Sequence, residues 1–408
     1  MQWGIVIPMV FATLGLWMVV LAPVVLLLPL QVAAIVNPTH SAGVDTGGPL
    51  SLVLAPGALA AIVLNPIVGH FSDRSFARTG SRRVWLLATA IAAACGVLFI
   101  GAAGSLWMLA LGWALASAGG NALLSIIWSL MPDHIPVARR GAVSGLLGVS
   151  QAIAGVVAVL IAGLPTMTAV SILGGVAVLS VVWLAVRLPR SAPRPVASGG
   201  GLLALVKSYW VNPVRHPNFG WTWVNRFLLF LATSMVVNYQ VYFLMSVVRT
   251  TAAETQRIVQ ISTLVITVGT LLGSFLGGFL SDRLRGRKYF VVAAALLVVV
   301  GFAVLILTQS IPGFFVAMFL VGLGNGTYFA VDIAVATQVL PDEGRTAGKD
   351  LAVFNLANNL PQSLAPAIAP LFLAIGGVAG GNYVALYIAG SIVAFVGAFL
   401  ILPVRGVK

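Results

Sequence analysis

The chain has 408 residues, of which 60% are hydrophobic and only 8% are charged, and its formal net charge is +13. A soluble protein carries about 25% charged residues to cover its surface, so this composition excludes a soluble globular protein and indicates a membrane protein. The basic residues lie in short loops between apolar runs and only one cysteine is present, which excludes a nucleic-acid-binding stripe, a disulfide framework and a cysteine metal cluster.

Twelve apolar segments are long enough to cross a bilayer, because a spanning helix needs roughly 20 apolar residues. We therefore predict an all-α membrane protein. The predicted transmembrane helices cover residues 5–36, 50–72, 84–102, 105–131, 139–164, 167–187, 219–247, 255–281, 289–308, 312–340, 346–375 and 381–403. Prolines in the first and eleventh segments predict kinks, since proline removes a backbone hydrogen-bond donor. These prolines are Pro23, Pro29, Pro361, Pro366 and Pro370.

One long polar loop divides the twelve segments into two groups of six. It begins with Pro-, Ser- and Gly-rich sequence that is typical of a linker. We predict an N-terminal six-helix bundle at residues 1–190, a cytoplasmic linker at 191–218, and a C-terminal six-helix bundle at 219–408.

The basic residues predict the orientation of the chain in the membrane. If both termini are cytoplasmic, all but three of the 22 Lys and Arg residues lie on the cytoplasmic side. The exceptions are Arg249 and Arg257 on the opposite side and Arg226 within the seventh segment. Cytoplasmic loops of membrane proteins carry this excess of Lys and Arg.

Two motifs recur at one offset. Residues 69–74 and 278–283 both read G-x-x-S-D-R, and their aspartates are 282 − 73 = 209 residues apart. A Pro-Asp pair repeats at the same spacing, because 342 − 133 is also 209. Two landmarks in one register indicate an internal duplication, and a parallel repeat of this size in an apolar chain is typical of transporters.

Twelve spans in two parallel halves, each with G-x-x-x-D-R and a basic loop after its second helix, resemble the major facilitator superfamily over essentially the whole chain. The first motif, with a stretched loop before G-x-R-R, looks like the sugar–cation and sucrose–proton symporter branch. The resemblance implies that these motifs hold the cytoplasmic side closed. The implied gate residues are Gly69, Asp73, Arg74, Arg82, Arg83, Gly278, Asp282, Arg283, Arg287 and Lys288. A fixed structural staple is the alternative, because it uses the same contacts without switching.

Charges inside a membrane are costly and are therefore candidates for function. Of the nine acidic residues, only Asp332 lies clearly inside a predicted span, about 12 Å from its cytoplasmic end at 1.5 Å per residue. Arg226 lies at a similar depth in the seventh segment, and the superfamily architecture places both helices at the central cavity. We expect the two to pair, and protonation of Asp332 to loosen the pair during transport. A permanent buried ion pair, or an Arg226 that extends to the interface, are the alternatives.

Uncharged polar side chains beside aromatic rings suit a neutral, hydroxyl-rich substrate, because amides bind hydroxyls and rings stack on the apolar faces of sugars. Interhelical hydrogen bonding is the alternative role for such residues. The predicted substrate-binding residues are Asn355, Asn359, Gln362, Tyr242, Asn238, Asn325, Tyr328, Trp128, Asn121, Trp17 and Gln151.

The sequence shows no nucleophile–base pair, metal-ligand spacing or phosphate-binding loop, so we expect no enzyme, metal site, catalytic residue or cofactor. We expect a monomeric secondary transporter of a bacterial inner membrane, coupled to protons or possibly to sodium. Its substrate is expected to be a small neutral solute, with sugar or glycoside import as the leading interpretation. Export of hydrophobic drug-like or natural compounds, and a non-transporting membrane receptor or scaffold, are the alternatives.

Overall fold

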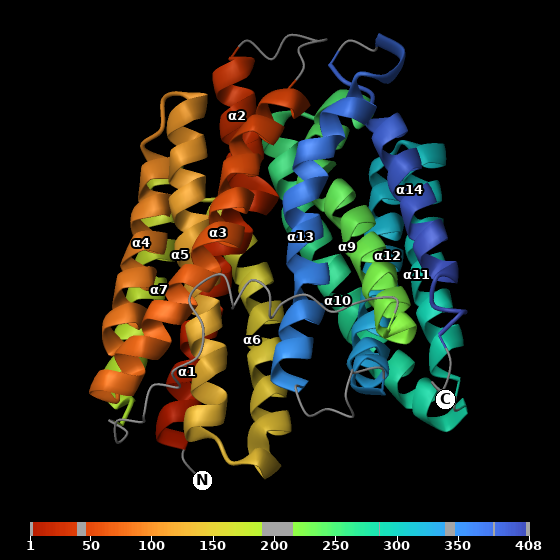
Figure 1. Ribbon diagram of the computed structural model, residues 1–408. Coiled ribbons are helices and arrows are strands. Elements are labelled where there is room, and N and C mark those ends of the chain that lie inside the picture. Colours follow the sequence, from red (N-terminus) through yellow and green to blue (C-terminus); the bar gives the residue numbers. More distant parts are fainter. Residues whose placement is uncertain are drawn as a thin grey trace. The chain divides into compact units, whose positions relative to one another are not determined.

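The computed structural model describes residues 3–38, 46–189, 215–284, 286–338, 347–377 and 380–404, and within them helices are the only regular secondary structure (Figure 1). The first half contains α1 (Trp3–Ala22), a π-helical turn η1 (Pro23–Leu27), α2 (Leu28–Val36), α3 (Gly47–Thr79), α4 (Arg83–Gly101), α5 (Leu106–His134), α6 (Val137–Ala162) and α7 (Thr166–Arg187). The second half contains α9 (Pro217–Phe243), a π-helical turn η2 (Leu244–Val248), α10 (Ala252–Leu284), α11 (Arg287–Thr308), α12 (Ile311–Gln338), α13 (Ala347–Leu373), a 3₁₀ turn η4 (Ile375–Gly377) and α14 (Tyr383–Phe399).

Within the described residues, nine helical stretches are long and apolar enough to cross a membrane. They are Gly4–Val36, Arg83–Gly101, Leu106–Met131, Val143–Ala162, Thr166–Arg187, Pro217–Val248, Ala252–Ser281, Arg287–Thr308 and Ile311–Asp332. Shorter apolar stretches occur in the other three long helices, at Gly47–Ala61, Leu364–Leu373 and Tyr383–Phe399. The predicted all-α fold with twelve membrane helices is confirmed.

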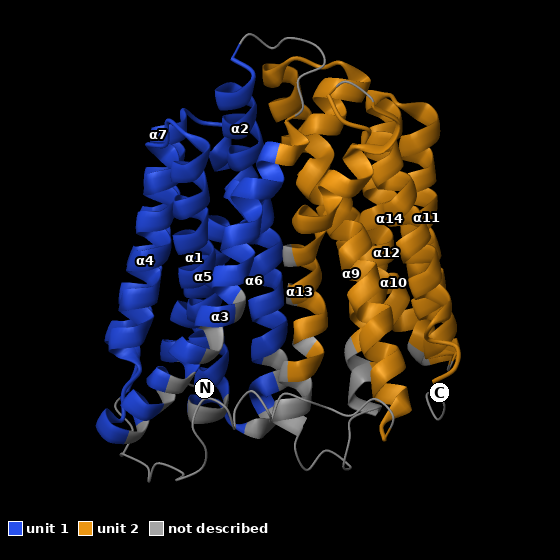
Figure 2. Cartoon of the chain, turned by 45° about the horizontal axis from the view of Figure 1, so that its top comes forward, with its two compact units in different colours: residues 1–41, 49–198 blue, residues 42–48, 199–408 orange. Residues whose placement is uncertain are grey.

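The chain forms two compact units, residues 1–41 with 49–198 (unit 1) and residues 42–48 with 199–408 (unit 2), which Figure 2 colours separately. In unit 1, α1 packs against α6 and α7, and α4 packs against α5 and α7. In unit 2, α9 packs against α13 and α14, and α11 packs against α12 and α14. These four helix contacts recur at equivalent positions of the two units, in agreement with the predicted duplication. The domain boundary at 191–218 stays a prediction, since residues 190–214 lie outside the described residues.

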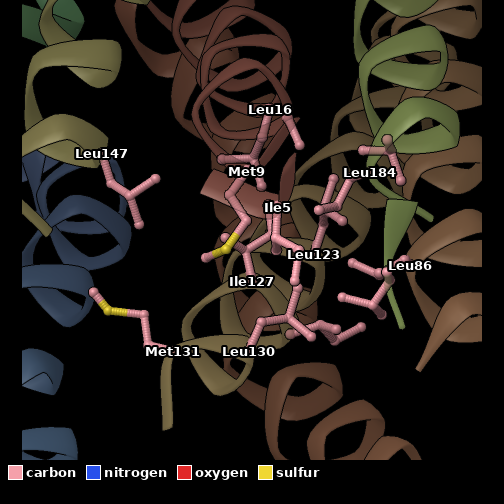
Figure 3. Packing of buried hydrophobic residues seen from close by; sticks show 14 of the residues in the cluster. Ile5, Met9, Leu16, Leu86, Leu123, Ile127, Leu130, Met131, Leu147 and Leu184 are labelled. Carbon is pink, nitrogen blue, oxygen red and sulfur yellow. The ribbon is translucent and has the colours of Figure 1, made fainter. Parts of the chain in front are cut away.

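Unit 1 has its core where α1, α4, α5, α6 and α7 meet (Figure 3). Large aliphatic side chains from all five helices fill this space, among them Met9, Leu86, Leu123, Leu147 and Leu184. Each of these side chains is at most 2% exposed. Removing such side chains from a packed interior costs about 2–5 kcal/mol, so this core fixes the helices of unit 1 relative to one another.

Unit 2 contains a close backbone contact between α10 and α12. A Cβ atom added at Gly273 would meet the carbonyl oxygen of Leu323, and one added at Gly326 would meet that of Thr270. The hydroxyl of Thr327 donates to the carbonyl of Gly273 at 3.2 Å across this contact. Small residues allow membrane helices to approach this closely, and α10 and α12 therefore form one rigid pair.

The first membrane helix is interrupted where the sequence predicts a kink. The backbone N–H of Leu28 donates to the carbonyl of Pro23, five residues back, which closes a π-type turn. In the eleventh membrane helix, the three predicted prolines all lie inside α13. The first membrane helix continues past Pro23 and Pro29 through η1 and α2, and α13 continues past its three prolines.

Candidate functional site

The two intramembrane charges lie on neighbouring helices of unit 2. Arg226 is in the third turn of α9, which begins at Pro217, where a missing N–H costs no hydrogen bond. Asp332 is in α12, whose first turn is capped by the hydroxyl of Ser310, which accepts from the N–H of Gly313 at 3.3 Å. The Nη1 atom of Arg226 forms an ion pair with Oδ2 of Asp332, and their side chains are only 8% and 2% exposed.

Two phenylalanine rings enclose the guanidinium of Arg226. Its Cζ atom lies 4.7 Å from the ring centroid of Phe354 on α13 and 5.4 Å from that of Phe230 on α9. A cation over an aromatic face gains about 0.5–2 kcal/mol, with the larger values in desolvated sites. The ion pair is therefore held by three helices, because α9 and α12 supply the charges and α13 supplies the second ring.

A chain of hydrogen bonds surrounds the pair. The hydroxyl of Tyr328, one turn before Asp332, donates to Oδ1 of Asn225 at 3.1 Å. The amide of Asn225 then donates to the carbonyl of Gly397 on α14 at 2.7 Å. The indole N–H of Trp223 donates to the carbonyl of Val353 on α13 at 2.9 Å. The surroundings of Asp332 are therefore connected to α9, α13 and α14.

A buried ion pair of this kind can act as a proton switch. Desolvation makes separated charges costly, so the carboxylate and guanidinium stabilise each other only while both are charged. Adding a proton to Asp332 removes the negative charge and leaves Arg226 buried with no counter-charge. The structure shows the pair and its burial, and a role in proton coupling stays a prediction.

Several predicted substrate-binding residues are buried within unit 2. Asn238 is 6% exposed, and Tyr242 and Tyr328 are each 1% exposed. The ring of Tyr242 lies 6.3 Å from that of Tyr383 on α14. Asn325 is partly buried and accepts a hydrogen bond from the hydroxyl of Thr233 at 3.4 Å. These side chains contact other helices of their own unit, and a role in substrate binding stays a prediction.

The candidates on α13 are described in part. The side chains of Asn355 and Asn359 lie outside the described residues. Gln362 is exposed, and its Nε2 atom donates to the carbonyl of Asn358 at 3.3 Å. Of these three, only Gln362 has a described side chain that could reach a solute.

Unit 1 contributes the more exposed candidates. Trp128 on α5 is 45% exposed, and Gln151 on α6 is also exposed. Trp17 is partly buried against the core of unit 1. Asn121 is partly buried, and its amide donates to the carbonyl of Ser117 at 2.9 Å. Trp128 and Gln151 thus present an indole ring and an amide that their own unit does not cover.

The first copy of the predicted gate makes contacts within unit 1. Arg82 is buried, donates to the hydroxyl of Ser72 at 3.2 Å, and places its guanidinium 4.7 Å from the ring centroid of Phe76. Arg83 donates to the carbonyl of Leu188, directly after the end of α7. The side chain of Asp73 lies outside the described residues, Arg74 is exposed, and a Cβ atom added at Gly69 would meet no atom within 4 Å.

The second copy behaves similarly in unit 2. Lys288, in the first turn of α11, donates to the carbonyl of Val404, which follows α14. Thus in each unit a basic residue at the start of the third membrane helix binds a backbone carbonyl that follows the sixth. The remaining residues of this copy carry fewer described contacts. Asp282 lies outside the described side chains, Arg283 is exposed, Arg287 is partly buried, and Gly278 lies near Ala330.

Four residues that sequence reasoning did not select belong to the site. They are Asn225, Trp223, Phe230 and Phe354. The sequence position of Asn225 beside Arg226, and of Phe230 one turn later, is a signal that could have identified them. The position of Phe354 could not have been found in this way, because the rotation of α13 about its own axis is set by packing.

Comparison with known proteins gives the family. The sequence matches the Major Facilitator Superfamily over residues 6–266 and 243–408. No curated protein matches the sequence significantly.

Among solved structures, a bacterial homologue of the human lysosomal transporter Spinster, inward-facing and unoccupied, is similar with a TM-score of 0.68 and 16% identity, over 98% of this chain and 94% of that one. The nucleoside transporter NupG is similar with a TM-score of 0.69 and 13% identity, over 100% of both chains. These similarities show a shared fold. With the family match over both halves, the chain is a member of the major facilitator superfamily of membrane transporters.

Proposed function

We propose that this transporter is proton-coupled and imports a small neutral solute that carries several hydroxyl groups, such as a sugar or glycoside. Membership of the superfamily supports alternating access, in which the substrate site opens to one side of the membrane at a time. The observation that carries the coupling proposal is the buried ion pair between Arg226 and Asp332.

The burial of Asp332 supports proton coupling. A carboxylate with 2% exposure is closed to solvent in this conformation, so proton exchange at this group requires a conformational change. Conversely, neutralising the carboxylate removes the ion pair that joins α9 and α12. Proton binding and helix movement are then linked in both directions, as coupling between two sites requires.

The character of the exposed polar candidates supports a neutral substrate. Trp128 and Gln151 are exposed within unit 1, and Gln362 is exposed in unit 2. Indole rings and amides bind the apolar faces and hydroxyl groups of sugars. The only ion pair described within a span is already satisfied internally, so it offers no open counter-charge for a charged substrate.

The decisive experiment is uptake into proteoliposomes with an imposed pH gradient. A panel of labelled sugars, glycosides, nucleosides and hydrophobic compounds first identifies a transported solute. Nucleosides belong in the panel because they are neutral, hydroxyl-rich and the named substrate class of NupG. We expect Asp332→Asn to lose gradient-driven accumulation while it retains exchange of labelled for unlabelled solute, because exchange needs no net proton movement.

Glu254→Gln serves as the matched control, since Glu254 is exposed and accepts hydrogen bonds from Thr251, the residue directly before its own helix. It should accumulate solute as the unaltered protein does. Normal pH-driven accumulation by Asp332→Asn would remove Asp332 from coupling. Transport of hydrophobic compounds alone would favour the alternative function of an exporter. If no compound of the panel is transported, the alternative of a non-transporting receptor is favoured.

A further inference from the structure

A hollow of about 390 Å³ lies at the predicted cytoplasmic end of α3, beside the start of α4. The residues that line it are two arginines, two hydroxyl residues and two aromatic residues. They are Phe71, Arg74, Ser75, Arg78, Thr79 and Trp85. Pockets that bind small molecules have volumes of about 300–1,000 Å³, so this hollow can hold a polar headgroup.

The two arginines lie on one face of α3. Arg74 and Arg78 are four residues apart, which places them one above the other on a helix. Both are exposed, and in the described part of the chain neither guanidinium has a hydrogen-bond or ion-pair partner. Thr79, by contrast, donates to the carbonyl of Ser75 at 2.8 Å, which fixes that side of the hollow. Two guanidinium groups that have no partner among the described residues therefore line the same hollow.

An aromatic pair forms the other side of the hollow. The rings of Phe71 and Trp85 are stacked, with centroids 6.1 Å apart and planes at 14°. Trp85 is in the first turn of α4, where the apolar span begins at Arg83. Tryptophan at this position is typical of the level of the lipid headgroups. The hollow thus combines charge on the water side with aromatic surface on the lipid side.

We infer that the hollow binds the phosphodiester headgroup of an anionic membrane phospholipid. Guanidinium groups bind phosphate oxygens through paired, charge-assisted hydrogen bonds. The ring pair contacts the glycerol and the first acyl carbons of the same lipid. Anionic lipids are present in the cytoplasmic leaflet, to which the orientation predicted from the basic loops assigns this end of α3.

The second half of the chain lacks this arrangement and supplies a control. Arg283 occupies the repeat position of Arg74, since 283 − 74 = 209. However, α10 ends at Leu284, one residue later, whereas α3 continues to Thr79 and so includes a second arginine. In addition, Leu280 replaces the aromatic residue Phe71. Arg283 is thus an exposed arginine at an equivalent helix end. It lacks the extra turn of helix that carries Arg78 and the aromatic ring that Phe71 supplies.

The inference is tested by native mass spectrometry of the purified full-length protein titrated with phosphatidylglycerol, and separately with phosphatidylcholine. A basic residue that meets an anionic lipid contributes a factor of about five in binding, and Arg74 and Arg78 line the hollow whereas Arg283 does not. The apparent affinity for phosphatidylglycerol should therefore fall about fivefold in Arg78→Gln and more than tenfold in Arg74→Gln/Arg78→Gln. Arg283→Gln should remain within twofold of the unaltered protein, and phosphatidylcholine binding should not change.

Inorganic phosphate distinguishes the lipid from a soluble ligand. Millimolar phosphate should leave phosphatidylglycerol bound, because it cannot use the aromatic surface. Displacement of the lipid by phosphate would assign the hollow to a soluble anion and overturn the inference.

Equal lipid affinity of the double variant and the unaltered protein would also overturn the inference. Should the double variant not fold, Arg74→Lys/Arg78→Lys, which keeps both charges, is compared with Arg78→Gln and is expected to bind more tightly.

Discussion

Arg226 and Asp332 depend on each other because each is buried. Replacing one member of a buried pair leaves an uncompensated charge and costs about 3–5 kcal/mol, whereas replacing both with apolar residues is often neutral. Phe354 adds a contact that is specific for the cation, since its ring centroid lies 4.7 Å from the guanidinium. The pair is therefore a poor source of net stability.

We predict that Arg226→Met destabilises the protein by about 3–5 kcal/mol and that adding Asp332→Leu restores most of this loss. Thermal unfolding in detergent measures both variants, with Glu254→Gln as the control for removing a charge at the exposed end of a span. A double variant that is no more stable than Arg226→Met would show that the ion pair does not carry this energy.

Sequence reasoning found both charges and predicted their pairing, which the structure confirms, because hydropathy and helical rise are local properties. It could not find Phe354, which lies 128 residues after Arg226 (354 − 226) and meets it only through the packing of α13 on α9. It also assigned Tyr242 and Tyr328 to substrate binding from their chemistry alone. The structure places both among neighbouring helices, and burial of this kind depends on which face of a helix is covered.

At the scale of helices, each unit ties its third membrane helix to the end of its sixth. Arg83 binds the carbonyl of Leu188, and Lys288 binds that of Val404. Leu188 directly follows α7, and a cation at a helix C-terminus is favourable because the last carbonyls are unpaired and the helix dipole is negative there. Val404 lies five residues beyond the end of α14, so the contact of Lys288 is made with the segment that follows that helix. These contacts are made inside one unit, so for these two residues they support the structural staple rather than the switching gate.

If the staple is correct, Arg83→Gln and Lys288→Gln each lower stability by about 0.3–1 kcal/mol, and their effects add because the residues lie in different units. Hydrogen exchange at the last turn of α7 or α14 should rise only in the variant that affects that helix. Lost transport with unchanged exchange would instead support the gate.

The contact between α10 and α12 gives a further test. Gly326→Ala and Gly273→Ala would each place a methyl group against a backbone carbonyl, and such overpacking costs about 1–3 kcal/mol. Gly278→Ala, on the same α10, is the control, because its nearest neighbour would be the Cβ atom of Ala330 at 3.6 Å. Thermal unfolding should separate the first two variants from the third, and equal stability of all three would refute the close contact.

Hydropathy predicted the membrane helices but not their ends. The second segment was expected to end at residue 72, whereas α3 continues to Thr79, and the eighth was expected to end at 281, whereas α10 continues to Leu284. Hydropathy indicates where a segment leaves the hydrocarbon core of the bilayer. Backbone hydrogen bonds can extend the same helix beyond that point into water. The extra turns of α3 carry Arg78 and so complete the hollow described above.

At the scale of the whole molecule, the chain consists of two units that share four equivalent helix contacts, as expected for a superfamily whose members expose a site alternately to each side. The side on which the termini lie stays a prediction from the basic loops. The two ends of α10 offer a direct test, because 33 residues at 1.5 Å extend about 50 Å, more than the thickness of a bilayer.

We predict that a membrane-impermeant maleimide, applied to intact cells, modifies Ala253→Cys but not Leu284→Cys. Both positions are exposed, at opposite ends of α10. A Cys95→Ala background removes the one native thiol, which is also exposed. Permeabilised cells should label both variants, which confirms that each thiol is reactive. The reverse pattern in intact cells would place the termini outside.

The opposite charges of Arg226 and Asp332 cancel, so in its unprotonated form the site is electrically neutral. If transport is coupled to protons through Asp332 as proposed, the site with a protonated carboxyl group carries one positive charge through the hydrocarbon. A membrane voltage does work on that charge, about 2.3 kcal/mol per 100 mV for full passage, and none on the neutral form. For a neutral solute, the inward current should then equal the proton flux, and the voltage dependence should reside in the step that moves the protonated site.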